Sequence, residues 1–179
     1  YIVLSTRHTI GHKRNIGARA ARGDIIAHWE DDDWYEDNRL SQQSRPIRDS
    51  RASLTTLSYS YLLDIDTSQV YVPRQRTTFM GSLMYSKSVV NMFDFPDVSL
   101  AEDVYFAMIA TRGCFRHVNI AGVKSVYVRH SLFNTWIWSF NDTERSLSEV
   151  LRPNFITSRF IQERSVIAGS TCSVLKQYS

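Results

Sequence analysis

Hydrophobic and polar positions along the chain recur with two different periods, which predicts a domain of mixed helices and strands. The continuous apolar run Ile25–Ala27 is typical of a strand buried on both faces. The apolar residues 1–4 predict an earlier strand. Between the two strands, small and apolar residues recur at helical spacing over residues 12–22, which predicts a helix. This order of strand, helix and strand predicts a βαβ unit, and so a sheet that is at least partly parallel.

The remaining elements follow the same two patterns. Alternating or β-branched runs predict strands over residues 52–66, 68–74, 81–86, 114–118 and 124–130. Helical spacing predicts helices over residues 36–51, 87–93 and 99–113, with Ser99 and Glu102 as a capping box at the start of the last one. We expect an α/β domain over residues 1–140, followed by a helical tail over residues 141–179 that breaks at Pro153.

Composition narrows the class of protein. With 179 residues and 43% hydrophobic residues, the chain is long and apolar enough for one domain with its own core. The net charge of +3 fits an anionic ligand and gives no nucleic-acid footprint. Cys114 and Cys172 have no metal-ligand spacing, which favours a reducing compartment. No apolar run reaches the length of about 18 residues that a transmembrane helix needs. We therefore expect a cytoplasmic protein, with peripheral attachment to a membrane as the alternative.

The acidic run Glu30–Asp33 stands directly after the predicted strand at residues 24–29. Like charges about 5 Å apart repel by roughly 1 kcal/mol per pair in water and by more near a protein surface. One interpretation is a solvated loop. The other is a site for Mn²⁺ or Mg²⁺, because ligands bind at the carboxyl ends of strands in open α/β sheets and hard cations prefer oxygen ligands. Trp29 and Trp34 flank the run, and we expect them to anchor it in the core.

Three further features of the sequence are candidates for chemistry. Lys13 and Arg14 begin the first predicted helix, where the helix dipole disfavours cations, so they either extend into solvent or face an anion such as phosphate, with Asn15 as a neutral donor. Asp103 lies in the first turn of its helix without a capping role, which suits a general base. His130 follows a predicted strand and is either structural or a ligand of a manganese-like ion.

In this order, the features resemble the inverting family-two glycosyltransferases of the GT-A fold. The resemblance is carried by "IGHKRNIGARAARGDIIAHWEDDDWYEDNRL", "GSLMYSKSVV", "AEDVYFAMIATRG" and "VRHSLFNTW", over residues 10–138. It implies an α/β fold of GT-A-like (Rossmann-like) type, with a mixed, mostly parallel central sheet flanked by helices. Because the family's base-binding strand and loop and a second acidic strand precede the part that matches "YIVL", the resemblance predicts an N-terminally truncated form. The Gln-x-x-Arg-Trp motif of processive members is absent from the sequence.

The resemblance also implies roles for individual residues. Its donor-binding residues fall on Lys13, Arg14, Asn15, Glu30, Asp31 and Asp32, with Glu30 where the family usually has aspartate. Its metal ligands fall on Asp32, Asp33 and His130, and its catalytic base falls on Asp103. We place acceptor binding at Trp34, Gly81, Ser82, Glu102 and Trp136.

The expected function is transfer of a sugar, with inversion and with Mn²⁺ or Mg²⁺, from a nucleoside-diphosphate sugar to a hydroxyl acceptor. A glycan, a lipid or a small molecule fits as the acceptor, and nucleic acid and transmembrane segments are not expected. One alternative is a catalytically inactive GT-A remnant or a nucleotide- or sugar-binding module. Another is a metal-dependent phosphohydrolase, for which Asp24 and Asp64 are poorly placed. The sequence leaves the sugar, the acceptor and the oligomeric state open.

Overall fold

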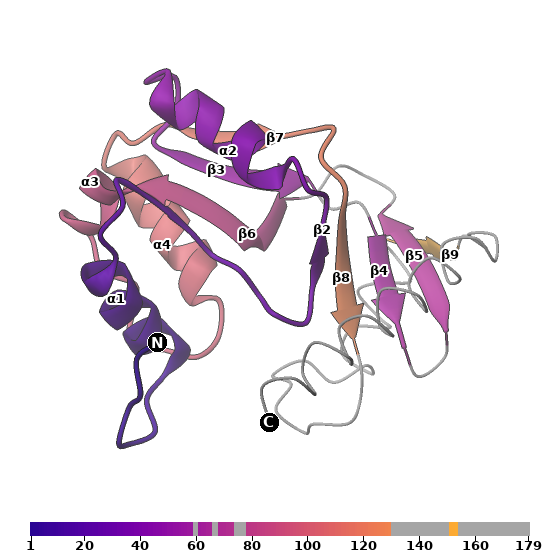
Figure 1. The fold of residues 1–179 in the computed structure, drawn as a ribbon, viewed down its shortest axis with the longest axis horizontal. Coiled ribbons are helices and arrows are strands. Elements are labelled where there is room, and N and C mark those ends of the chain that lie inside the picture. The colour runs from indigo at the N-terminus through magenta and orange to yellow at the C-terminus, as the bar shows by residue number, and fades with distance from the viewer. Residues whose placement is uncertain (59–60, 66–67, 74–77, 130–150, 154–179) are drawn as a thin grey trace.

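The computed structural model describes residues 1–58, 61–65, 68–73, 78–129 and 151–153. Within these residues the strands form two sheets, which stand side by side in Figure 1. The first sheet has the order β1 (Ile25–Ala27), β6 (Thr78–Ser86), β3 (Leu54–Ser58) and β7 (His117–Ile120). The second sheet has the order β2 (Trp34–Tyr35), β8 (Ser125–Arg129), β4 (Tyr61–Asp64), β5 (Gln69–Pro73) and β9 (Leu151–Pro153).

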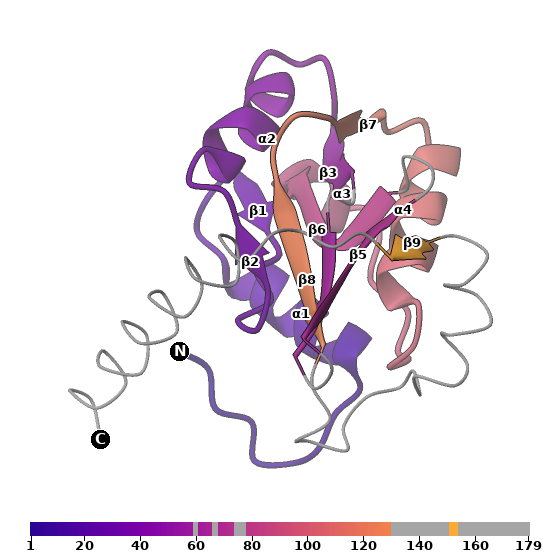
Figure 2. The same cartoon turned by 90° about the vertical axis from the view of Figure 1, so that its right-hand side faces the viewer.

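Helices cover both faces of the first sheet. The helices described are α1 (Ile10–Ala20), α2 (Arg39–Arg48), α3 (Lys87–Val90) and α4 (Glu102–Arg112). Figure 2 shows α2 and α4 on opposite sides of β6, with α1 below them. This arrangement of sheets flanked by helices confirms the predicted mixed α/β, GT-A-like class. No helix in the described ranges combines the length and apolarity needed to span a bilayer.

Strand pairing differs from the expected mostly parallel sheet. Among the described strands, parallel pairs occur between β3 and β7 and between β4 and β8, whereas β6 runs antiparallel to both β1 and β3. The predicted βαβ unit is wrong, because residues 1–4 join no strand of the described sheets. Ile2 and Val3 are 50% and 80% exposed. Without a neighbouring strand to bond with, this apolar segment cannot form a ladder.

Two other predicted elements differ from the strands observed in the sheets. The predicted strand 52–66 is divided, so that β3 lies in the first sheet and β4 in the second, where β4 and β5 form an antiparallel pair. In the tail, residues 151–153 form β9 and pair with β5, which differs from the predicted helix at this point. The helical prediction for the rest of the tail lies outside the described residues.

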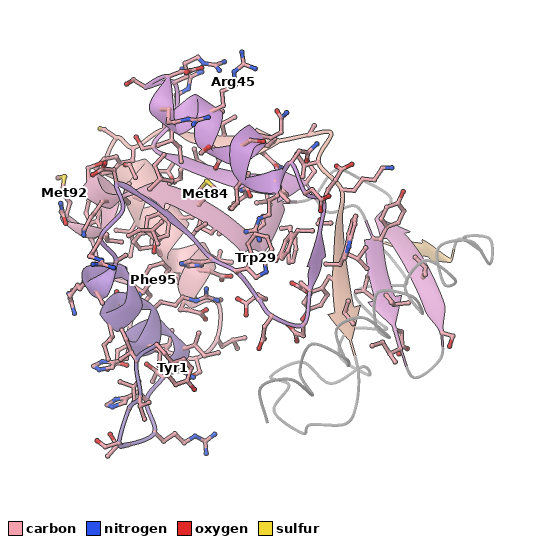
Figure 3. All side chains as sticks on the ribbon, viewed as in Figure 1. Tyr1, Trp29, Arg45, Met84, Met92 and Phe95 are labelled. Atoms are coloured by element: carbon pink, nitrogen blue, oxygen red, sulfur yellow. The ribbon has the colours of Figure 1, made fainter. Side chains whose placement is uncertain are left out.

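The main core lies between the first sheet and α4. Leu83 and Tyr85 of β6 pack with Phe95 and Phe106, whose rings are stacked at 3.8 Å between centroids. Figure 3 shows Phe95 beside α1, so the segment that precedes α4 also packs against α1 and holds it in place. The contact is close: a Cβ at Gly11 would lie 1.8 Å from the carbonyl oxygen of Pro96, so no residue with a side chain fits there. This docking brings the start of α1 next to the start of α4.

Candidate functional site

Arg14 joins three segments that are far apart in the sequence. From α1, its Nη2 donates to Oε1 of Glu30 at 3.1 Å, and its Nε donates to Oε1 of Glu102 at 2.9 Å. The side chain of Arg14 is 16% exposed, that of Glu102 is 6% exposed and that of Glu30 is 41% exposed. The structure therefore brings together the basic motif of α1, the acidic run and the start of α4. Both arginine bonds are charge-assisted and partly shielded from water, which strengthens them.

The start of α4 differs from the predicted capping box. The helix begins at Glu102, and its N-cap is Ala101 in the left-handed region with φ 58°, without a side-chain capping bond. Ser99 instead accepts a hydrogen bond from the backbone N–H of Ile10 at 3.2 Å. Glu102 is therefore free of the capping role and available as the buried partner of Arg14. The predicted capping box is wrong because this tertiary ion pair takes the carboxylate.

Asp103 lies next to this ion pair and is half-buried. Burial works to lower the pKa of Arg14, but the charges of Glu30, Glu102 and Asp103 outweigh it, and the net shift is upward. The influence of Asp103 on Arg14 places its carboxylate within electrostatic reach of the same cluster. It lies in the first turn of α4, where the helix dipole stabilises a negative charge. The charges of Asp103 and Glu30 therefore both act on Arg14, although only Glu30 of these two is bonded to it.

Within the acidic run, the carboxylates point in different directions. Asp31 and Asp32 are exposed. Asp33 turns back toward β8, where its Oδ1 accepts from the backbone N–H of Val128 at 3.0 Å and its Oδ2 accepts from the hydroxyl of Tyr35 at 3.2 Å. Burial, with smaller contributions from the charges of Asp32 and Glu30, raises the pKa of Asp33 to about 7.

In the described part of the chain, the carboxylates of the acidic run do not form a metal site by themselves. Among the residues that the structure describes, no three His, Cys, Asp or Glu side chains are grouped so that they could hold a metal ion. Of the predicted set, Asp32 and Asp33 are described, whereas His130 lies outside the described residues, as does Trp136 of the predicted acceptor site. The donor chemistry fits Mn²⁺ or Mg²⁺, since the available atoms are carboxylate oxygens. The ligand set itself stays a prediction.

The side chain of Asn15 is hydrogen-bonded to the backbone of the segment before α4. Its Nδ2 donates to the carbonyl oxygen of Phe95 and its Oδ1 accepts from the N–H of Phe95, both at 2.8 Å. This two-bond contact gives Asn15 a structural role in docking α1, and its predicted contact with the donor stays a prediction. Lys13, its neighbour on α1, is exposed.

The predicted acceptor residues of β6 have different environments. A Cβ at Gly81 would lie 3.6 Å from Cγ of Glu30, which places this glycine beside the acidic run. Ser82 is fully buried; its hydroxyl donates to the carbonyl oxygen of Phe79 at 2.5 Å and accepts from the N–H of Leu57 at 2.7 Å. The hydroxyl therefore uses its donor and one of its two acceptor sites within the sheet. The predicted contact of Ser82 with the acceptor stays a prediction. Trp34 is half-buried in β2, opposite Val126.

A buried arginine that the sequence analysis missed supports the acidic run. Arg39 of α2 is fully buried, and its Nη2 donates to the carbonyl oxygen of His28 at 2.5 Å. Its guanidinium lies 3.7 Å from the ring centroid of Tyr35 and 4.6 Å from that of Trp29, and these two ring centroids are 5.1 Å apart, so the three side chains pack together beside the acidic run. Trp29 itself is 54% exposed, which corrects the expectation that it is buried in the core. Because α2 is strongly polar, nothing in the sequence pattern distinguishes Arg39 from a solvent-exposed residue.

His28, which the sequence analysis also missed, lies between the two arginines. Its Nδ1 is 2.6 Å from Nη1 of Arg14, and its carbonyl oxygen accepts from Arg39. Burial, followed by the charges of these two arginines, lowers the pKa of His28 well below its ordinary value. A single histidine in an apolar run gives no sequence signal for this position.

Comparison with known proteins identifies the family of the chain. The family model described as "Glycosyl transferase family 2" matches residues 1–94, more than half of the chain, and the match includes α1, the acidic run and β6. Among solved structures, the chain is similar to the one titled "Crystal Structure of A197 from STIV", with a TM-score of 0.44, 17% sequence identity and 70% of each chain covered. A search of the curated proteins finds no match. The chain belongs to glycosyl transferase family 2.

Proposed function

We propose that this glycosyltransferase moves a sugar from a nucleoside-diphosphate sugar to a hydroxyl acceptor with inversion at the anomeric carbon. The observation that supports it best is the ion-pair cluster in which Arg14 holds Glu30 and Glu102 together, with Asp103 beside it. The cluster joins the predicted donor side, at the acidic run, to the predicted base, at the start of α4. Two substrates that must react with each other need such a junction, since the reacting atoms have to lie about 3–3.5 Å apart.

In the proposed reaction, Asp103 acts as the general base. It accepts the proton of the acceptor hydroxyl while the acceptor oxygen forms a bond to the anomeric carbon and the bond from that carbon to the diphosphate oxygen breaks. The electron pair of the broken bond leaves with the nucleoside diphosphate. Glu30 faces the donor, and Gly81 leaves room beside it because no side chain stands there. Lys13, exposed on α1, is a cation that could interact with the diphosphate.

A divalent cation is part of the proposal. Asp32 and Asp33 are its proposed ligands, together with His130, which the sequence places directly after β8. When bound, Mn²⁺ or Mg²⁺ would neutralise charge on the leaving diphosphate. A cation bound beside Asp33 would favour its ionised form and so oppose the burial that raises the pKa of this carboxyl.

Assay of the full chain with a panel of uridine and guanosine diphosphate sugars tests the proposal. In the presence of Mn²⁺ we expect transfer, an inverted anomeric configuration in the product by NMR, and loss of transfer when a chelator removes the metal. Asp103→Asn should lower turnover by about 10²–10⁴-fold. The matched control is Asp94→Asn, which affects only an exposed ion pair with Arg19.

Turnover of Asp103→Asn at the wild-type rate would remove Asp103 from the mechanism, and a retained configuration would exclude direct displacement. The alternative of an inactive binding module makes a different prediction: calorimetry would detect nucleoside diphosphate binding, but no donor would be turned over.

A further inference from the structure

His28 occupies a fixed position directly after β1 and is separated from the acidic run by Trp29 alone. It is 8% exposed, and its backbone N–H donates to the carbonyl oxygen of Leu83 at 2.8 Å. Its ring meets the ring of Tyr85 edge-on, with centroids 5.4 Å apart, and lies 5.3 Å from the ring of Phe95. With Arg39 bonded to its carbonyl oxygen, both the main chain and the ring of His28 are held in place.

The partners of the ring determine which nitrogen carries the proton. Arg14 has only donor groups, so at 2.6 Å its Nη1 must donate to Nδ1 of His28, and Nδ1 must be the acceptor. The proton of a neutral ring then lies on Nε2, which is 3.2 Å from the hydroxyl oxygen of Tyr85 and donates to it. The lowered pKa of His28, caused first by burial, agrees with a neutral ring.

This bond has a consequence for the orientation of Arg14. A guanidinium group is planar and rigid, so fixing one nitrogen fixes the directions of the other two. With Nη1 held by His28, Nη2 points at Glu30 and Nε points at Glu102. Without an acceptor at the position of Nδ1, the buried Nη1 loses its partner, and the guanidinium can rotate away from one of the two carboxylates.

We propose that His28 is a positioning residue for glycosyl transfer: its neutral ring, protonated on Nε2, fixes Arg14 and thereby the placement of Glu30 relative to Asp103. The inference rests on the proposed function, in which these two carboxylates face the two substrates. His28 does not touch either substrate in this scheme. It acts through Arg14, and an apolar residue of similar size fills its space without replacing its role.

NMR on the ¹⁵N-labelled full chain tests the protonation state directly. In a long-range ¹H–¹⁵N correlation spectrum at neutral pH, assigned with the His28→Asn variant, we expect the pattern of a neutral ring with the proton on Nε2. A proton on Nδ1, or a doubly protonated ring, would overturn the proposal because neither form can accept from Arg14.

Two variants test the effect on Arg14. In His28→Asn, the side-chain oxygen stands close to the place of Nδ1 and can accept from Arg14, whereas His28→Leu fills the volume without an acceptor. The Nη1–H signals of Arg14 should stay sharp in the wild type and in His28→Asn, and should be lost to rotation and exchange in His28→Leu, because Nη1 is the nitrogen that donates to His28. A sharp signal in His28→Leu would show that His28 does not fix the guanidinium.

Activity supplies the second measurement on the same proteins. With stability followed by thermal unfolding, His28→Leu should lower kcat by about 10²-fold, the scale of a misplaced catalytic group, and His28→Asn should recover at least about tenfold of that loss. Equal losses in the two variants, or full turnover in His28→Leu, would overturn the positioning role. A wild-type chain that transfers no sugar would overturn the proposed function instead, and the two NMR signals would still decide whether His28 fixes Arg14.

Discussion

Arg14 on α1 donates from Nε to Oε1 of Glu102 on α4 at 2.9 Å, although 88 residues separate them in the sequence. The same guanidinium reaches Glu30, so one cation compensates carboxylates from two motifs. The crowding of negative charge at residues 30–33 is therefore relieved in part by the chain itself: by Arg14 at Glu30 and by the turn of Asp33 toward β8. A divalent ion, where it binds, adds to a network that already exists.

Removing this cation should destabilise the fold. In Arg14→Met, Glu102 stays 94% shielded without a charged partner, and leaving one member of a buried pair alone costs about 3–5 kcal/mol. Urea unfolding followed by circular dichroism measures the change. The control is Arg19→Met on the same helix, which breaks an exposed pair with Asp94 and should cost less than about 1 kcal/mol. Equal losses in the two variants would mean that Arg14 and Glu102 behave as a surface pair.

The contact between Asn15 and Phe95 predicts a local effect. Asn15→Ala leaves the N–H and the carbonyl oxygen of Phe95 without their partner, which should cost about 1–3 kcal/mol per unsatisfied buried group. Hydrogen exchange of the Phe95 amide should accelerate by more than the change in overall stability explains. Asn38→Ala is the control, since Asn38 makes no side-chain capping bond at the start of α2. Unchanged exchange at Phe95 would argue that Asn15 is held for another purpose, such as donor binding.

The raised pKa of Asp33 predicts a dependence of stability on pH. Because burial raises this pKa from 3.8 to about 7, the folded chain binds the proton more tightly than the unfolded chain. The contribution of Asp33 to stability is therefore complete below about pH 3.8 and is lost as the pH rises toward 7. Asparagine imitates the protonated form, so Asp33→Asn should gain a few degrees in Tm relative to the wild type between about pH 5 and pH 8.

The measurement of Asp33→Asn is made by calorimetry with a chelator present, because a bound cation would favour the ionised carboxylate. A Tm difference between wild type and variant that does not change over this pH range would contradict the assigned environment of Asp33. Addition of Mn²⁺ at about pH 8 should then raise the Tm of the wild type more than that of the variant.

Gly17 of α1 and Gly81 of β6 should respond in opposite directions to substitution by alanine. A Cβ at Gly81 would lie 2.9 Å from Cε2 of the buried Phe79 and 3.6 Å from Cγ of Glu30, so Gly81→Ala should disturb both the core and the acidic run. At Gly17 no atom lies within 4 Å of the added Cβ, and alanine should stabilise the helix by up to about 1 kcal/mol. Thermal unfolding and transfer assays measure both; a loss of activity in Gly17→Ala but not in Gly81→Ala would contradict the placement of the site.

The local pattern of the sequence was sufficient to predict the existence of α1, α4 and β1 and the mixed α/β class. Each of these depends on apolar spacing and stop signals within a few residues. The same pattern could not show that residues 1–4 pair with no described strand, or that residues 52–66 divide between two sheets. Pairing depends on which strands are available as neighbours, and no local signal contains that information.

For the site, the sequence determined that charged residues of the right types occur at Arg14, Glu30 and Asp103, and their order led to the family. Only the tertiary structure decided that Glu102 pairs with Arg14 rather than capping its helix, that Asn15 holds Phe95, and that Ser82 is buried. It also brought His28 and Arg39 to the acidic run. The reason is physical: a polar side chain takes the strongest partner within reach, and that partner is set by the packing of distant elements.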